Sequence, residues 1–267
     1  MLPYSTRPTA EAILSDVPAL APYARPAVLL HPTPGSPGPH DSSVAGPLLW
    51  PADEPWPVCS VPDVLSTDGQ PASAMIPVVQ VFRRDAPGDW WPEDADVFQV
   101  LWCPNEHEDP PAPQADANPV VEVRWRRTAD LPATPRTPPR PTRQADPDDG
   151  FSPAPCLLTP VPLTDFPYPE CLPDDVERDV ARLVEATRHD DHGDLITRVA
   201  GCKFGGWPSW HLTGPGQVDC PACGIPMDLL FTIASDDTTN ICVGRWGDLR
   251  IFVCPADADH GHVFDVH

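Results

Sequence analysis

Residues 75–85 read MIPVVQVFRRD, and residues 227–237 read MDLLFTIASDD. The two stretches align without a gap, since each begins with Met, continues as a short run of apolar and β-branched residues, and ends with Asp. Short runs of this composition between turn-forming segments are typical of β-strands. The chain is therefore predicted to contain the same strand twice.

The sequence on either side of this strand also repeats. Downstream, VFQVLWCP (97–104) matches DLRIFVCP (248–255), and the cysteine lies 28 residues after Met75 in the first copy and 27 residues after Met227 in the second. Upstream, VAGPLLWPADEPWPVC (44–59) matches KFGGWPSWHLTGPGQVDC (203–220) in its order of Gly, Trp-Pro and Cys. An ordered match of this length indicates an internal repeat.

The predicted fold class is α+β and predominantly β, with internally duplicated antiparallel β-sheet units and a few helices. VVEVRWR (120–126) alternates apolar and charged residues and is predicted as a further strand. Prolines in residues 127–155 are too dense for a helix or a central strand. The expected parts are an N-terminal helix and Pro-rich arm (1–43), a first β-rich repeat (44–126), a Pro-rich connector (127–172), an amphipathic helix (173–200) and a second β-rich repeat with a zinc site (201–267).

Two helices are predicted. The first covers residues 9–17, where Thr9 caps the helix and Pro18 stops it. The second begins near residue 173 and places apolar side chains on one face, namely Val176, Val180, Leu183, Val184 and Thr187. The stretch RHDDHGD (188–194) that follows contains possible metal ligands, but we interpret it as a solvated helix end.

A Cys-x-x-Cys pair in DCPACGIPMD (219–228) provides two thiolates, Cys220 and Cys223. A tetrahedral zinc ion needs two more ligands. The strands of the second copy return the chain to Cys254, and His260 follows with C-x5-H spacing; His262 is the alternative and would need a longer turn. A Cys3His set favours Zn²⁺ over calcium or magnesium, and four protein ligands predict a structural role.

In the first copy, Cys59, Cys103 and His107 occupy the corresponding places. Residues 60–74 contain no second cysteine, so this possible second site lacks one ligand. We interpret it as a degenerate copy. Three residues are considered for completing it: Asp63, His31 and His40. The remaining cysteines show no ligand spacing and are predicted to be small core residues: Cys156, Cys171, Cys202 and Cys242.

The chain has 39 Asp and Glu against 17 Lys and Arg, a formal net charge of -22. This charge repels nucleic acid and anionic membranes, so the expected partner is another protein that is basic. The oligomeric state stays open. Nine cysteines at irregular spacings fit reduced thiols and metal ligands, and the N-terminal residues show no secretory signal pattern. We therefore expect a cytoplasmic protein.

The chain has nine tryptophans, most of which cluster in proline-rich turns around residues 50–56, 90–102 and 207–210. Such aromatics either line a groove for an extended peptide or close the ends of a twisted sheet. The basic cluster RWRR (124–127) is interpreted as the outer face of a strand whose arginines pair with carboxylates, not as a nucleic-acid site.

No nucleophile elbow, phosphate-binding loop or H-E-x-x-H motif is present in the sequence. We therefore expect a non-enzymatic, zinc-stabilised protein-interaction module. The alternatives are an enzyme whose site is assembled only in space, and a structural or accessory subunit of a larger complex.

The motifs GGWPSW, DCPACGIPM, WGD (246–248) and IFVCP resemble the YwqG-like family of bacterial proteins of unknown function, and LLWPADEPWPVC, PVVQVFRRD and FQVLWCPNEH resemble its actinobacterial branch. The resemblance spans most of residues 44–265. It implies a duplicated, mainly β fold and a distant relation to the zinc-bearing domain of programmed cell death protein two, a chaperone of a ribosomal protein. Members have been proposed as immunity proteins against toxins, and the family brings no catalytic residues. Thr232 departs from the family's glutamine, which Gln80 retains in the first copy.

Overall fold

The structure is a computed structural model that describes residues 8–62, 73–105, 107, 110, 113–114, 119–141, 150–187, 201–210 and 214–267. Asp63, the RHDDHGD stretch and the end of the predicted helical segment (188–200) lie outside these residues. The elements in chain order are α1 (Ala10–Asp16), a 3₁₀ helix (Pro18–Tyr23), β1 (Arg25–Pro34), β2 (Ser43–Val44), β3 (Val58–Cys59), β4 (Ser73–Ala74), β5 (Ile76–Phe82), β6 (Val97–Trp102), β7 (Val121–Arg126), a 3₁₀ helix (Thr128–Asp130), β8 (Cys156–Asp165), a 3₁₀ helix (Pro169–Cys171), α2 (Asp174–Thr187), β9 (Cys202–Gly205), β10 (Asp228–Ala234), β11 (Asp248–Val253), a 3₁₀ helix (Ala258–His260) and β12 (His262–Val266).

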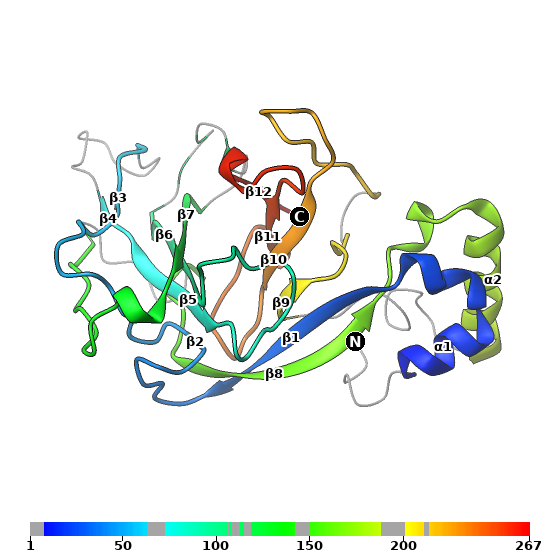
Figure 1. Cartoon of the computed structure of the whole chain (residues 1–267), viewed down its shortest axis with the longest axis horizontal. Helices are drawn as coiled ribbons and strands as arrows, with labels where there is room; N and C mark the ends of the chain where they lie inside the picture. Colours follow the sequence, from blue (N-terminus) through cyan, green and yellow to red (C-terminus); the bar gives the residue numbers. More distant parts are fainter. Residues whose placement is uncertain are drawn as a thin grey trace.

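Ten strands form one antiparallel sheet in the order β12-β11-β10-β9-β1-β8-β2-β5-β6-β7 (Figure 1). Its centre is the pair β1 and β8, which run side by side over ten residues from Arg25 opposite Asp165 to Pro34 opposite Cys156. The strands β9 to β12 continue the sheet from β1, and β2, β5, β6 and β7 continue it from β8. The predicted α+β, predominantly β class is confirmed.

The two central strands lie in segments that were predicted to be a Pro-rich arm and a Pro-rich connector. That prediction was wrong for residues 25–34 and 156–165. Proline is normally confined to strand edges because it has no N–H to donate. The register of the β1 and β8 pair shows how these strands accommodate five prolines.

Backbone groups of a strand face its two neighbours alternately. Gly35 N donates to Pro155 O, so odd-numbered residues of β1 face β8, and Leu158 N donates to Ser42 O, so even-numbered residues of β8 face β2. The missing N–H groups therefore all point away from the central ladder, since the prolines are at even positions: Pro26, Pro32, Pro34, Pro160 and Pro162. β9 pairs with β1 only over Ala27–Leu30, and β2 pairs with β8 only at residues 156 and 157, so most of these prolines face no paired neighbour.

The hairpins β5–β6 and β10–β11 have the same pairing geometry. Ile76 lies opposite Trp102 in the first, and Asp228 lies opposite Val253 in the second. Both hairpins shift register at the same aligned place, between Pro77 and Val79 in the first and between Leu229 and Phe231 in the second. The predicted strands 75–82 and 96–103 thus correspond to β5 and β6 within a residue at each end.

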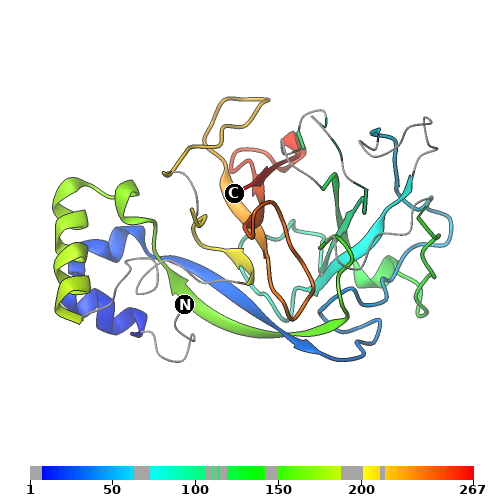
Figure 2. The same ribbon diagram turned by 180° about the vertical axis from the view of Figure 1, so that it is seen from behind.

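The strands that continue from β1 and those that continue from β8 contribute to one core because the sheet curls. Phe98 from β6 lies 5.0 Å from Phe204 of β9 and 5.2 Å from Phe231 of β10, measured between ring centroids. The outer strands also approach each other, since Trp125 Nε1 of β7 donates to His262 Nε2 of β12 at 3.4 Å. Figure 2 shows the curled strands on one side of the molecule and the helices on the other.

The helices α1 and α2 pack together at the end of the β1–β8 ribbon (Figures 1 and 2). Thr9 caps α1 as predicted, accepting from Ala12 N at 3.3 Å. The predicted face of α2 is confirmed over the described side chains, because Val176, Val180 and Val184 are buried against Ile13, Val17 and Leu20. None of the helices in the described part of the chain has the length and apolar character that a membrane-spanning segment needs.

A buried ion pair connects β8 with β9, the two strands that flank β1. Asp165, the last residue of β8, accepts from Lys203 Nζ of β9 at 2.6 Å and from Trp207 N at 2.8 Å through the same oxygen. Both side chains are almost fully buried, with 3% of Lys203 and none of Asp165 exposed. A second acceptor for Lys203 is the Trp207 carbonyl at 2.8 Å. Both charged groups are therefore paired and also hydrogen-bonded to the backbone, which offsets the cost of burying them.

Replacing one partner of this pair leaves the other charge buried without compensation. We expect Lys203→Met to lower the free energy of unfolding by about 3–5 kcal/mol. Arg182→Ala is the control, because it breaks an ion pair with Asp179 whose side chains are 71% and 46% exposed and should cost at most about 1 kcal/mol. Urea denaturation followed by tryptophan fluorescence measures both. If both variants lose the same free energy of unfolding, the buried pair contributes no more to stability than an exposed one, and the prediction is wrong.

Candidate metal centre

Four predicted ligands of the second copy come together in the structure. The donor atoms of Cys220, Cys223, Cys254 and His260 all lie within 4.8 Å of one another. Cys223 Sγ is 3.6 Å from Cys254 Sγ, and His260 Nδ1 is 3.4 Å from Cys254 Sγ and 3.6 Å from Cys220 Sγ. A tetrahedral zinc ion with ordinary bond lengths separates two sulfurs by about 3.8 Å and a sulfur and a nitrogen by about 3.6 Å. The cluster therefore has the dimensions of a four-coordinate metal site.

Local backbone geometry explains why these side chains meet. The Cys-x-x-Cys segment closes a tight turn, in which Gly224 N donates to Cys220 O at 2.8 Å and Cys220 N donates to Ile225 O at 2.9 Å. Gly224 has φ +71°, a conformation that glycine adopts without strain. Cys254 directly follows β11, whose partner β10 begins just after the turn. Both parts of the cluster thus lie at the same end of the β10–β11 hairpin.

The structure places His260 in the cluster and His262 elsewhere. Asp257 caps the short 3₁₀ helix Ala258–His260 by accepting from Asp259 N at 2.9 Å, which directs His260 back to the cysteines. His260 Nε2, the ring nitrogen that faces away from the sulfurs, lies 3.8 Å from Asp257 Oδ2. His262 begins β12 and its Nε2 accepts from Trp125. Burial lowers the pKa of His262.

The surroundings of Cys254 favour its thiolate form, which metal binding needs. Burial opposes ionisation of Cys254, but hydrogen bonds from the Ala256 backbone and from His260 outweigh it and lower the pKa of the Cys254 thiol to about 6. The hydrogen bond with Cys254 raises the pKa of His260 in turn.

A second cluster brings together Cys59, Cys103 and His107, whose donor atoms also lie within 4.8 Å of one another and whose side chains are all buried. Cys59 Sγ is 3.6 Å from His107 Nε2, and His107 Nδ1 is 2.9 Å from Pro62 O. The hydrogen bond from Cys103, helped by His107 and opposed by burial, lowers the pKa of Cys59 to about 5. Either cluster could hold a metal ion. Within the described residues, neither His31 nor His40 joins this second cluster.

The other cysteines differ in exposure. None of the nine forms a disulfide. Cys156 and Cys202 are buried, as expected of core residues, and burial raises the pKa of Cys202 to about 12. Cys171 is exposed and Cys242 is partly exposed, so the prediction that all four lie in the core was wrong for these two. Cys171 ends the 3₁₀ helix Pro169–Cys171, and Cys242 lies in the connection between β10 and β11.

Most tryptophans fill the interior and do not line a groove. Five are buried: Trp50, Trp56, Trp91, Trp102 and Trp210. Arg126 stacks 4.3 Å above the Trp50 ring, and Arg250 stacks 4.3 Å above the Trp210 ring. Of the two interpretations, the structure thus favours aromatics that cover the sheet. Trp90, Trp125 and Trp207 are half-buried, and Trp246 is exposed, with 53% of its surface accessible.

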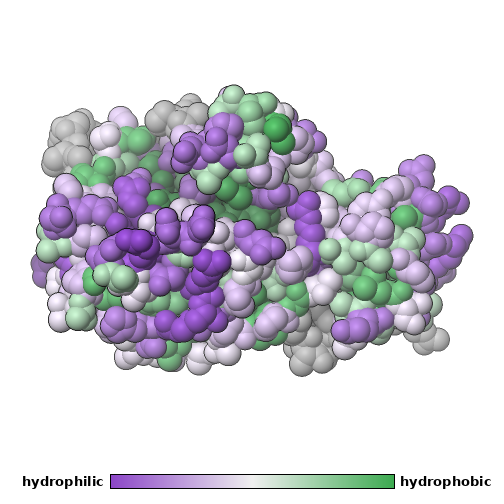
Figure 3. All heavy atoms as spheres, in the orientation of Figure 1, coloured by the Kyte–Doolittle hydropathy of each residue, from purple (hydrophilic) through white to green (hydrophobic). Residues whose placement is uncertain are grey.

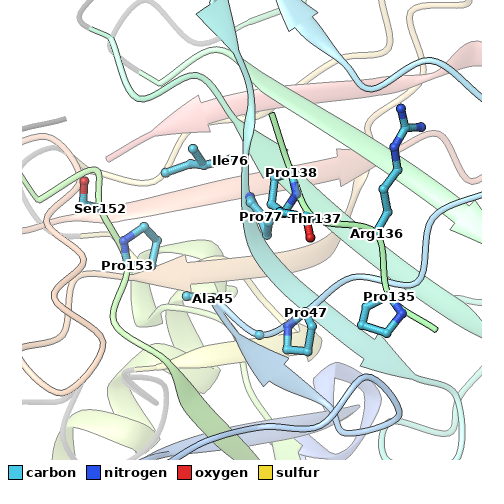
Figure 4. A pocket seen from close by; sticks show the side chains of 11 residues that line it. Ala45, Pro47, Ile76, Pro77, Pro135, Arg136, Thr137, Pro138, Ser152 and Pro153 are labelled. Atoms are coloured by element: carbon cyan, nitrogen blue, oxygen red, sulfur yellow. The ribbon is translucent and has the colours of Figure 1, made fainter. Parts of the chain in front are cut away.

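A shallow groove of about 440 Å³ is present at another place, and proline is the most frequent of its lining residues (Figure 4). Its walls come from the start of β5, from residues 45–47 and from residues 135–138 and 152–153. Five of its residues are prolines: Pro47, Pro77, Pro135, Pro138 and Pro153. Arg136 lies at its margin and donates to the Glu54 carbonyl at 2.7 Å. The groove is therefore apolar, open and stiff.

The arginines of RWRR pair with acidic side chains, as predicted. Arg126 is bidentate with Glu54, Arg124 pairs with Glu122, and Arg127 pairs with Asp130. The bond with Arg126 is the main reason that the pKa of Glu54 is lowered. These charges are neutralised within the chain.

Comparisons with protein-family models and with curated proteins find no match to this chain. The resemblance to the YwqG-like family therefore stays a prediction, and the arrangement of the residues supplies the functional argument.

The backbone conformation of Gly224 can be tested separately from the room that is available for a side chain there. A Cβ at Gly224 meets no atom within 4 Å, and the same is true at Gly214, but only Gly224 has a positive φ. We expect Gly224→Ala to destabilise the metal-loaded protein by about 1–2 kcal/mol, because the left-handed conformation is costly for alanine. Gly214→Ala should change stability by no more than about 0.5 kcal/mol. Thermal unfolding and chelator competition measure the two effects. A neutral Gly224→Ala variant contradicts the proposed turn geometry.

Proposed function

We propose that the chain is a non-enzymatic, zinc-stabilised module that binds a basic protein in the cytoplasm. The observation that carries this proposal is the four-donor cluster of Cys220, Cys223, Cys254 and His260. Its spacing matches a closed tetrahedral site, and such sites stabilise a fold because all four positions are taken by protein.

Zinc is the metal that this donor set favours. Three thiolates and an imidazole are soft or borderline ligands, whereas calcium and magnesium bind oxygen. The cluster connects the turn before β10 to the end of β11. Zinc there would hold closed the end of a hairpin whose edge is covered only by the five-residue strand β12.

The net charge of -22 supports a basic protein partner and disfavours nucleic acid and anionic membranes. On the face shown in Figure 3, hydrophilic side chains cover much of the strand portion, and apolar patches are separated by them. The proline-lined groove in Figure 4 suits an extended segment of that partner, because its rigid walls lose little entropy on binding.

We further propose that the chain contains two copies of one β-sheet unit. The matching register shifts of β5–β6 and β10–β11 and the two Cys/His clusters at corresponding hairpin ends support this proposal.

The resemblance to the YwqG-like family supports two kinds of partner, a cationic toxin for an immunity protein or a ribosomal protein for a dedicated chaperone. The neighbouring genes distinguish these alternatives. A toxin gene beside this gene favours immunity, and a ribosomal-protein gene favours the chaperone.

Removal of one ligand tests the zinc site. We expect purified Cys223→Ser protein to contain about one equivalent less zinc than the unchanged chain and to unfold at a lower temperature. Cys171→Ser, at an exposed cysteine outside both clusters, should keep its zinc and its stability. Elemental analysis and calorimetry provide the measurements. Unchanged zinc content in Cys223→Ser removes this site from the proposal.

Charge placed in the groove tests the partner. Thr137 lines the groove and Thr134 lies outside it, and both are exposed. We expect Thr137→Arg to weaken binding of an arginine-rich peptide about tenfold, through like-charge repulsion and lost space, and Thr134→Arg to weaken it much less. Fluorescence polarisation with arginine-rich and glutamate-rich peptides measures this. Binding of only the acidic peptide contradicts a basic partner.

A further inference from the structure

Two buried oxygen atoms without hydrogen-bond partners belong to residues that neighbour the cluster of Cys59, Cys103 and His107 in strand pairing or along the chain. They are Ser73 Oγ and Asn105 Oδ1. Ser73 lies opposite Cys59 in the β3–β4 pair, so the two side chains extend from the same face. Asn105 lies two residues from Cys103 and two from His107 along the chain. A buried polar atom without a partner is destabilising, so a pair of them near one cluster indicates a ligand that the protein does not supply.

His107 is already oriented as a metal ligand. The Pro62 carbonyl, 2.9 Å from Nδ1, can only accept a hydrogen bond, so Nδ1 carries the proton. In the neutral ring the lone pair is then on Nε2, which faces Cys59 Sγ at 3.6 Å. Metal-binding histidines are commonly held by such a bond from their other nitrogen.

The surroundings of this cluster exclude bulk solvent. Cys59 and Cys103 are part of a core with large apolar side chains, among them Leu48, Trp50, Trp56, Leu101 and Val120. Two thiolates and one imidazole fill three positions of a tetrahedral ion and leave the fourth for another ligand.

The geometry points to a metal site at Cys59, Cys103 and His107 whose fourth ligand is a water molecule that donates hydrogen bonds to Asn105 Oδ1 and Ser73 Oγ. A metal-bound water has two hydrogens, and both oxygens can accept. Three protein ligands and one water are the arrangement in which zinc polarises water. This site therefore differs in chemistry from the closed Cys3His cluster. It does not depend on the binding role proposed above.

Metal content of single-cluster variants tests the site in the full chain. Cys223→Ser/Cys254→Ser removes the closed cluster, and Cys59→Ser/Cys103→Ser removes this one. We expect one equivalent of Co²⁺ in each variant and two in the unchanged chain. X-ray absorption of the first variant should show two sulfur and two lighter ligands. The proposal is overturned if the folded variant binds no cobalt, which is the result expected of a metal-free thiolate–imidazolium pair. It is also overturned if the bound cobalt has only one lighter ligand. Should the variant not fold, uptake of only one equivalent by the unchanged chain overturns it.

The two oxygen atoms are tested by a matched set of variants. We expect Ser73→Ala and Asn105→Ala to lower the affinity of this cluster for Zn²⁺ about 10–100-fold in chelator competition. Ser43→Ala is the control, because Ser43 also has a buried hydroxyl without a partner but lies in β2. The affinity of the cluster for Zn²⁺ should not change in this variant. An equal loss in Ser43→Ala, or no loss in the other two variants, overturns the assignment of the water ligand. Zinc at Cys220, Cys223, Cys254 and His260 should persist in all three, so failure here is distinguishable from failure of the closed site.

Discussion

The antiparallel ladder between β1 and β8 is the constraint on which the rest of the structure depends. Its ten paired residues are the place where the two sets of strands meet. β9 pairs with β1 near one end of the ladder, and β2 pairs with β8 near the other. The first set, β2, β5, β6 and β7, follows β1 in the chain but continues the sheet from β8. The second set, β9 to β12, follows β8 in the chain but continues the sheet from β1. Neither set can therefore form its full sheet without the opposite part of the chain.

The two Cys/His clusters lie at corresponding ends of their hairpins but differ in the donor atoms that they offer to a metal ion. In the second, a tight turn adds Cys223, and the cluster has four protein donors. In the first, His107 is held by a backbone carbonyl, and two oxygens beside the cluster lack partners. One additional thiolate thus distinguishes a cluster with four protein donors from a cluster with three. The same hairpin framework can provide both, because the donors come from residues just outside the strands.

The sequence predicted what depends on local pattern. The strands at 75–82 and 96–103, the cap at Thr9 and the meeting of Cys220 with Cys254 all follow from spacing and residue type. The central strands were missed because proline density is an argument about local hydrogen bonding, and only the register shows that the missing N–H groups face away from the ladder. Ser73 and Asn105 gave no signal, since an unpartnered oxygen is a property of the packed structure. The Pro62 carbonyl is a backbone group and has no sequence signature at all.

Lys203 is the only lysine in the chain, and it is buried against Asp165. Acylating reagents and amine-directed cross-linkers act on exposed lysine side chains, and the folded protein offers them none. Labelling of Lys203 would then require the strands around it to separate, so the extent of acylation becomes a direct report of opening of the sheet. Immobilisation or fluorescent tagging through lysine would likewise select unfolded molecules.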